Sequence, residues 1–200
     1  MIINIHEEAA KKKEIWIKVQ NYIVVIFRDK LILEKISLIL HKSKTKLSVI
    51  LSAIYYFKKV RGRYALYLKR LDNLVTCNVT KYLVGKKRQV ALQATENDFN
   101  LFVISIIIAC KHLLDTVYTN YCWAEVSGIP ISNLNAYERT ILDILDYRTH
   151  IPNQSFYNIV DEFEKITGNV TIDRTSPTKK TSTLKCVLSC ITTKLTCINF

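Results

Sequence analysis

The chain has 200 residues, of which 49% are hydrophobic, with only 4 glycines and 3 prolines. This length suits one domain with a sizeable core, and the composition excludes collagen-like and low-complexity disordered chains. The net charge of +12 is unevenly placed: residues 98–166 carry nine acids and four bases, whereas the remainder carries 25 bases against eight acids. A nucleic-acid-binding module normally has its basic patch on the folded core, so this distribution disfavours that class of function.

The six cysteines form no Cys-x-x-Cys pair, and no histidine lies within ligand spacing of the three in the C-terminal segment, so we expect no metal site. Cys110 and Cys122 fall on apolar helix faces and are interpreted as small buried hydrophobic residues. No signal-peptide cleavage pattern follows the N-terminus, and the apolar run at residues 22–27 is too short to span a bilayer. We therefore expect an intracellular protein with no membrane partner.

The first 60 residues suggest helices that begin in a polar segment. Residues 1 to about 14 are expected to fray, and residues 15–28 fit either a helix or an extended segment, since residues 22–26 are partly β-branched. Leu31 to His41 has its apolar residues on one face, which predicts an amphipathic helix. After a short polar turn, Thr45 is the expected N-cap of a broad apolar helix from Lys46 to Val60.

Residues 61–98 interrupt this pattern. Two basic runs, at residues 61–63 and 85–88, flank an apolar stretch at residues 64–68 that fits a short helix or a strand. Structureless loops of this length are uncommon inside a compact domain unless they are functional or disordered. We interpret the segment as a basic, mostly exposed insertion that is dispensable for the fold, and a retained intron is the alternative explanation.

The run from Phe99 to Asp115 is apolar on every side, which predicts a helix at the centre of a bundle. It is interrupted by Lys111 and His112 too soon to span a bilayer. Lys111 is therefore expected near the end of a central helix, with apolar neighbours on most sides.

A second helix is predicted from about Asn133 to Asp146, with Ser132 as its N-cap. At about 100° per residue, Glu138 falls inside the apolar stripe of this helix. A carboxylate in that position is costly unless it is paired or hydrogen-bonded. Because Lys111 offers the opposite charge on a neighbouring helix, we predict that it pairs with Glu138.

Two shorter elements complete the predicted core. Residues 120–127 form a short helix that contains Trp123 and is closed by Gly128. Residues 155–166 form an amphipathic helix that ends at Gly168. From about residue 169 the chain is rich in Ser, Thr and Lys, which predicts a flexible tail. In this tail Ser176 precedes a proline and has the form of a proline-directed phosphorylation site, a short motif that often occurs by chance.

One stretch of the chain carries a specific order and spacing of residues. Its positions are Ile107, Ile108, Ala109, Cys110, Lys111, Asp115, Tyr118, Asn120, Trp123, Ala124, Val126, Gly128, Ile129, Leu134, Asn135, Glu138, Leu142, Leu145, Asp146, Tyr147 and Arg148. This pattern resembles the back half of a cyclin box, and in particular the single-box cyclins of the phosphate-pathway, or P/U, type.

The resemblance implies an all-α fold: a single cyclin-box five-helix bundle around a central buried helix, with flanking helices and a flexible tail. The box would occupy residues 29–166, with an N-terminal extension at 1–28, the insertion at about 61–98 and the tail at 167–200. The resemblance further implies a cyclin, which binds and activates a cyclin-dependent kinase in the cytoplasm and nucleus. No nucleophile motif, phosphate loop or histidine cluster indicates catalysis, so we expect no enzyme activity, cofactor or small-molecule substrate.

The resemblance also assigns roles to single residues. It implies that the kinase is bound by Lys111, Glu138, Leu114 and Asp115, and that the box is built on Trp123, Gly128, Asp146 and Arg148. Taken without the resemblance, the lysine and the glutamate are interpreted as a structural ion pair or as long side chains that reach solvent. The arginine is then a cation placed favourably at the C-terminal end of a helix.

The matched pattern has one departure. The family usually has an aspartate at the position of Lys58, partnered by an arginine in the first helix, and the same spacing here leads back to Asp29. We predict that the two charges have exchanged places and form an ion pair between the first two helices. A degraded front half of the box is the alternative.

A different class of function stays open as the rival hypothesis. A basic helical nucleic-acid-binding protein with a cyclin-like fold, of the kind found in transcription factors, would also suit the net charge of +12. Such a protein would bind DNA with a steep dependence on salt concentration.

Overall fold

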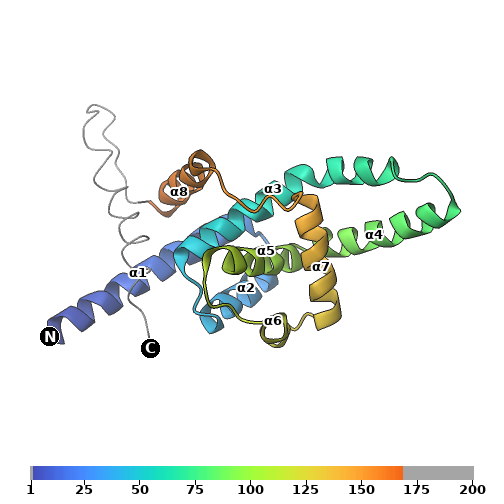
Figure 1. The fold of residues 1–200 in the computed structure, drawn as a ribbon. Helices are drawn as coiled ribbons and strands as arrows, with labels where there is room; N and C mark the ends of the chain where they lie inside the picture. The colour runs from blue at the N-terminus through green and yellow to red at the C-terminus, as the bar shows by residue number, and fades with distance from the viewer. Residues whose placement is uncertain (1, 169–200) are drawn as a thin grey trace, which may run out of the picture. The chain divides into compact units, whose positions relative to one another are not determined.

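The computed structural model describes residues 2–168, with side chains from residue 12 onward, and all regular structure within this range is helical. This confirms the predicted all-α class. No helix in that range is long and apolar enough to cross a membrane. In chain order (Figure 1) the helices are α1 (Ile2–Ile26), α2 (Lys30–Lys42), α3 (Leu47–Asp72), α4 (Asn78–Glu96), α5 (Asp98–Leu113), α6 (Asn120–Ser127), α7 (Ile131–Ile144) and α8 (Asn153–Thr167).

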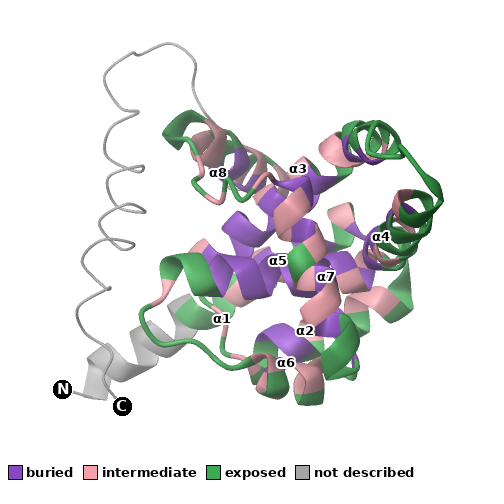
Figure 2. Ribbon diagram, turned by 45° about the vertical axis from the view of Figure 1, so that its right-hand side comes forward, coloured by how far each residue is buried: buried purple, intermediate pink, exposed green. Residues whose placement is uncertain are grey.

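Helix α5 is the centre of the fold, as its all-round apolar sequence predicted. Every residue from Leu101 to Cys110 is buried, and the helix contacts α2, α3, α4, α6 and α7 (Figure 2). Asn97 caps it, since the Asn97 Oδ1 atom accepts a hydrogen bond from the backbone N–H of Phe99 at 3.0 Å. The hydroxyl of Ser105 is satisfied inside the core by the carbonyl of Leu101 at 2.8 Å.

The N-terminal segment is helical from Ile2 to Ile26, so the prediction of frayed residues before position 15 was wrong. Helix α1 packs against α8, where the ring of Tyr22 meets Phe163 edge-on at 5.3 Å. Ile23 is fully buried whereas Val24 and Val25 are exposed. Because burial follows helical spacing here, packing outweighs the weak β preference of these residues.

Residues 61–98 are not a loop. Helix α3 continues to Asp72, beyond its predicted end at Val60, and α4 returns beside it, so the segment forms a helical hairpin (Figure 1). The inner face of the hairpin is buried and α4 packs against α7. The prediction of a mostly exposed insertion therefore fails for this inner face, whose buried residues are Tyr67, Leu71, Val84, Ala91, Ala94 and Thr95.

The predicted ion pair between Asp29 and Lys58 is wrong. Asp29 is the N-cap of α2, and its Oδ1 atom accepts hydrogen bonds from the backbone N–H groups of Leu31 at 2.8 Å and Ile32 at 3.4 Å. Lys58 instead donates to both carboxylate oxygens of Glu162 in α8, at 2.5 and 2.6 Å. The short aspartate side chain satisfies unpaired donors at its own helix start, while the long lysine reaches a different helix.

Replacing Asp29 with alanine is therefore expected to lower the free energy of unfolding by about 1 kcal/mol, because the cap of α2 is lost. Asp29→Asn should retain most of the stability, since asparagine caps helices equally well. Urea denaturation of the single variants and of Asp29→Ala combined with Lys58→Ala measures the coupling between the two residues. We expect additive effects; a clear coupling energy would restore the ion pair that the structure excludes.

Two predicted helix starts are also misplaced, and one predicted helix end is confirmed. The N-caps of α3 and α7 are Lys46 and Pro130, not Thr45 and Ser132. Neither observed cap makes a side-chain hydrogen bond to its helix, so packing rather than capping fixes these starts. Gly128 ends α6 with φ of 72°, in the left-handed region that favours glycine.

The described cysteines lie in contrasting environments. Cys77 is exposed at the start of α4, where hydrogen bonds, first of all with the backbone N–H of Thr80, lower the pKa of its thiol. Cys110 is buried in α5, as predicted, and burial raises the pKa of its thiol to about 11. Cys122, predicted to be buried, is only half-buried.

Because the thiolate is the reactive form, we expect iodoacetamide at a pH of about 8 to alkylate Cys77 in the folded protein and to spare Cys110. Peptide mass spectrometry of samples taken over time gives the two rates. In denaturant the two thiols should react at similar rates. Equal rates in the folded protein would contradict the burial of Cys110.

Candidate functional site

The C-terminal end of α5 brings Lys111 against Glu138 of α7. The Lys111 Nζ atom lies 2.6 Å from Oε1 and 2.9 Å from Oε2 of Glu138, so the pairing predicted from the sequence is present. The glutamate side chain is only 12% exposed, whereas that of the lysine is 37% exposed. A mostly buried acid thus holds a base that still reaches the surface.

Asn120, the first residue of α6, holds Glu138 from a second side. Its Nδ2 atom donates to Glu138 Oε2 at 2.6 Å and to Asn135 Oδ1 at 2.7 Å. Together with Lys111, it surrounds the carboxylate with donors, which offsets the cost of its burial. Asn120 was not among the predicted site residues, although a buried carboxylate requires a second donor and Asn120 belongs to the matched pattern.

The ion pair alone contributes little to stability. Lys111 is more than a third exposed, and salt bridges of that kind are worth about 0–1 kcal/mol because solvent screens them. The arrangement therefore fixes the position of two opposite charges at one end of the bundle more than it stabilises the fold.

The segment that follows Lys111 adds apolar surface. Leu114 is half-buried and lines a small cavity of about 80 Å³ together with Cys110 and Trp123. Asp115 is exposed and forms no ion pair within the described residues. The α5–α6 connection and its flanks leave apolar side chains partly in solvent: Leu113, Val117, Tyr118 and Tyr121.

Trp123 is part of the core, as predicted. It is 2% exposed, and its ring meets that of Tyr118 edge-on at 6.2 Å. Its neighbours in the small cavity come from the α2–α3 connection and from α5, so it fastens α6 to the bundle.

Asp146 and Arg148 lie beyond the C-terminal end of α7, away from Lys111. Asp146 forms ion pairs with Arg63 and Arg70 of α3, and these, Arg70 first, hold the pKa of its carboxyl below the usual range. The side chain of Arg148 is exposed, and its backbone carbonyl accepts a hydrogen bond from the Lys59 Nζ atom at 3.4 Å. Asp146, Arg148 and Asp29 thus lie apart from the Lys111–Glu138 pair. Ser176 lies outside the described residues.

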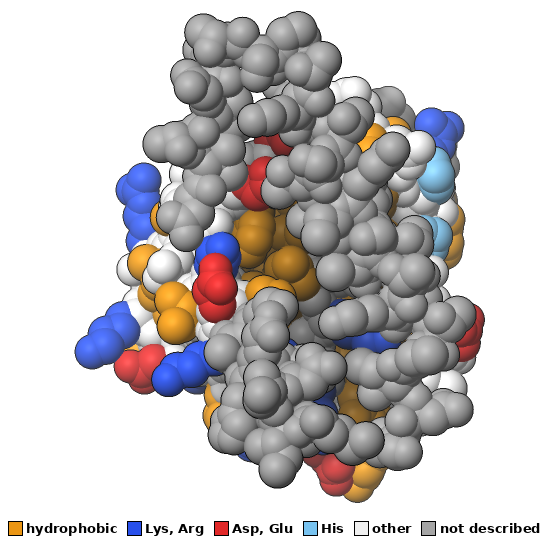
Figure 3. All heavy atoms as spheres, turned by 90° about the vertical axis from the view of Figure 1, so that its left-hand side faces the viewer, with side chains coloured by type: hydrophobic (Ala, Val, Ile, Leu, Met, Phe, Trp, Pro, Cys, Tyr) orange, Lys and Arg blue, Asp and Glu red, His pale blue; other side chains and the backbone are white. Residues whose placement is uncertain are grey.

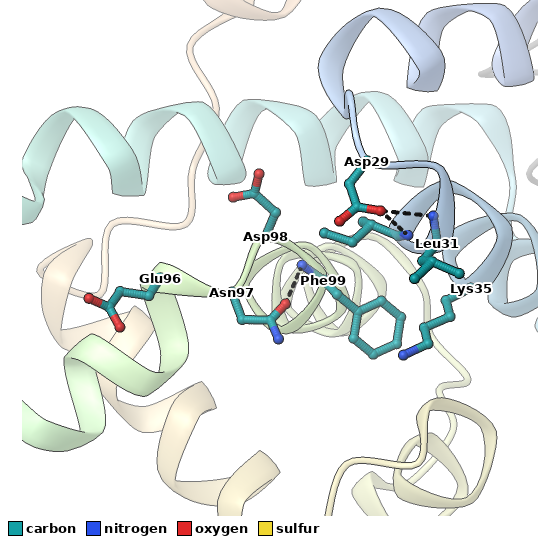
Figure 4. Close-up of a pocket in the computed structure, with 8 residues that line it drawn as sticks. Asp29, Leu31, Lys35, Glu96, Asn97, Asp98 and Phe99 are labelled. Atoms are coloured by element: carbon teal, nitrogen blue, oxygen red, sulfur yellow. Dashed lines mark hydrogen bonds between the residues drawn. The ribbon is translucent and has the colours of Figure 1, made fainter.

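A separate cleft of about 460 Å³ lies near the other end of α5 (Figure 4). Asp29 and Asn97, which line it, are turned back onto the helix starts that they cap. A third polar residue of the cleft, Asp98, forms an ion pair with Arg61. Contacts within the chain therefore engage these three side chains.

A family model of cyclins matches residues 8–149. The chain belongs to the cyclin family. This cyclin is 29% identical over 109 residues to Cyclin-U1-1 of Arabidopsis thaliana, a match that covers 50% of this chain and 52% of the relative. It is 26% identical over 117 residues to the G1/S-specific cyclin pas1 of Schizosaccharomyces pombe, which covers 58% of this chain and 23% of the relative. No solved structure matches it.

The cyclin thus spans about half the length of one relative and about a quarter of the other. The similarity to Cyclin-U1-1 is consistent with the P/U type that the sequence resembles. The family match starts inside the predicted N-terminal extension, includes the hairpin and ends before residue 166. Cyclins are regulatory rather than catalytic proteins, which agrees with the lack of catalytic motifs in the sequence.

Proposed function

We propose that this cyclin is the regulatory subunit of a cyclin-dependent protein kinase, which it binds through Lys111 and Glu138 and thereby activates. The observation that carries the proposal is the fixed pair of opposite charges at the end of the central helix. Exposed apolar and aromatic side chains border it. Apolar anchors around a few well-placed polar groups are typical of protein interfaces.

The pair has hydrogen-bonding capacity left for a partner. An ammonium group has three donors, and the Lys111 Nζ atom uses two of them on Glu138. A carboxylate has about four acceptor sites, so Glu138 has capacity beyond the bonds from Lys111 and Asn120. The two side chains can therefore bind a carbonyl and an N–H of the same backbone segment, with the strength of charge-assisted hydrogen bonds.

Such a contact would act on the kinase by fixing the position of its regulatory C-helix. Kinase catalysis needs an ion pair between a lysine and a glutamate of the regulatory C-helix. In the family that this chain resembles, the lysine and glutamate of the cyclin contact the kinase just before that helix. A rigid bundle docked there would favour the active orientation of the C-helix. The kinase, not the cyclin, would bind ATP and supply the reacting groups. We propose that the complex acts in the cytoplasm and nucleus, where fluorescence of the tagged protein should then appear.

The rival function, nucleic-acid binding, has the net charge of +12 in its favour. In the structure, however, Lys58, Arg63 and Arg70 are held in ion pairs with acids. The described part of the face in Figure 3 likewise shows basic and acidic side chains interspersed. These arrangements reduce the charge available to phosphates, so kinase binding is the better-supported function.

Purification of the tagged chain from its own cells tests the proposal. We expect a kinase catalytic subunit to co-purify in equimolar amount, and its phosphorylation of a peptide substrate to depend on the added cyclin. Absence of a kinase, or kinase activity that is unchanged by the cyclin, would contradict the proposal. A DNA-binding titration with a steep salt dependence would instead favour the rival.

A further inference from the structure

The α3–α4 hairpin has an anchored base and a projecting tip. Tyr67 and Ala91 are buried at its base, and Arg63 there ties α3 to Asp146. Beyond this base the two helices run past α7 (Figure 1). The tip, which we define as residues 69–88, is thus held in a fixed direction by the rest of the bundle.

The tip buries Leu71 and Val84 but leaves its other apolar side chains exposed. Five of them, in the α3–α4 connection and the first turns of α4, are between 40% and 68% exposed: Leu74, Val75, Val79, Tyr82 and Leu83. Val79, Tyr82 and Leu83 follow helical spacing and lie on the side of α4 away from the buried Val84 and Ala91. A cluster of exposed apolar side chains on one element marks an interaction surface.

The same tip is strongly basic, with six bases and one acid. The acid, Asp72, is neutralised by Arg88. Four of the bases take part in no ion pair within the described residues, although the Lys86 Nζ atom lies 4.8 Å from the ring centre of Tyr82. These four are Lys69, Lys81, Lys86 and Lys87.

We propose that this tip adsorbs to the surface of an anionic lipid bilayer. A bilayer interface accepts apolar side chains from a projecting element without a matching groove, while lysine head groups stay at the level of the lipid phosphates. This adsorption needs no membrane-spanning helix, but it is a membrane contact and therefore goes against the sequence-based expectation of no membrane partner. It does not rest on the proposed kinase binding.

Three other occupants fit the tip less well. A nucleic acid would place the apolar side chains against charged phosphates. A second copy of the tip would bring lysines against lysines. An acidic protein would need a concave surface shaped to the tip. The experiment below can detect such a partner.

The tip and the Lys111–Glu138 pair can be used at the same time. Helix α4 leads into the N-terminal end of α5 at Asp98, and Lys111 lies near the other end of that helix, about 20 Å along it. The membrane contact would therefore leave the proposed kinase-binding end exposed.

Co-sedimentation of the full chain with vesicles tests the proposal in the absence of any kinase. We expect binding to phosphatidylcholine–phosphatidylserine vesicles, weakened by salt, and no binding to phosphatidylcholine alone. Replacing Lys81, Lys86 and Lys87 with glutamine should weaken binding on the order of 100-fold, at about fivefold for each lysine. Val79→Ser with Leu83→Ser should also weaken it, although the charge is unchanged.

Matched control variants make the same types of substitution, lysine to glutamine and valine to serine, at exposed positions outside the tip. Replacing Lys30, Lys42 and Lys165 with glutamine removes three exposed charges away from the tip. Val24→Ser with Val25→Ser removes exposed apolar groups from α1. We expect both controls to bind vesicles like the wild type, and circular dichroism should show that all variants are folded.

Several results would overturn the proposal. These are no binding of the wild type to anionic vesicles, equal binding to both vesicle types, or equal losses in the tip and control variants. Binding to poly-glutamate without binding to vesicles would identify an acidic protein as the partner. Binding to duplex DNA that the lysine changes remove and the serine changes spare would identify a nucleic acid. Tip variants that lose vesicle binding but retain kinase binding would separate this proposal from the proposed function.

Discussion

Truncating Lys111 or Glu138 to alanine is expected to weaken binding of the partner kinase by about thirtyfold or more. At the centre of the complex the partner would remove both charges from water, and loss of one such group costs about 2 kcal/mol or more. The fold should persist, because the free protein leaves Lys111 more than a third exposed. Isothermal titration calorimetry with the purified kinase gives the change in affinity.

The chain offers a matched control in the Lys58–Glu162 pair. It has the same residue types and a similar separation of 2.5 Å, but it joins α3 to α8 and its side chains are 40% and 39% exposed. Alanine at either position should leave the kinase affinity unchanged. If the controls weaken binding as much as Lys111→Ala, or if neither pair matters, the Lys111–Glu138 pair has only a structural role. Glu138→Gln, which keeps an acceptor for Asn120, separates the loss of charge from the loss of this hydrogen bond.

Replacing residues 62–94 with a short glycine–serine linker is expected to abolish cooperative unfolding, in reversal of the sequence-based expectation that the segment is dispensable. The replacement removes the buried side chains of Tyr67, Leu71 and Val84, and it uncovers their partners in the bundle. Each large buried side chain contributes about 1.5–3 kcal/mol. Their sum is comparable with the whole stability of a domain, about 5–15 kcal/mol. Urea denaturation followed by circular dichroism measures the outcome.

A smaller change in the same hairpin serves as the control. Residues 73–79 are all exposed, so replacing them with a glycine–serine linker of equal length removes only the turn and the start of α4. We expect the transition to stay cooperative, with a loss of about 1 kcal/mol for the cap. If the longer replacement also unfolds cooperatively at an unchanged midpoint, the hairpin is not part of the core.

The centre of the fold and its charge pair could be predicted from the sequence because both depend on periodicity. Helix α5 is apolar at every angle, and only a helix surrounded by others can bury such a sequence. Glu138 falls within an apolar stripe, and that position required a partner that only a few nearby residues could provide. The structure supplies Lys111 at 2.6 Å.

The hairpin and the roles of Asp29 and Asn120 could not be predicted in the same way. The inner face of α4 includes Ala91 and Ala94, which add little apolar signal next to a run of lysines. Spacing along the chain placed Asp29 and Lys58 on adjacent helices, but it carries no information about the direction of a side chain. The contact of Asn120 with Glu138 likewise depends on how α6 packs against α7.

The central claim is that Lys111 and Glu138 act on a kinase rather than only on each other. The exchanged variant, Lys111→Glu with Glu138→Lys, tests it most directly. The two opposite charges can still pair within the cyclin, but each kinase group that binds one of them would now face a charge of the opposite sign. Phosphorylation of a peptide by the purified kinase is measured as each cyclin is titrated. We predict that the exchanged variant folds like the wild type and does not activate the kinase. Full activation by the exchanged variant would contradict the claim.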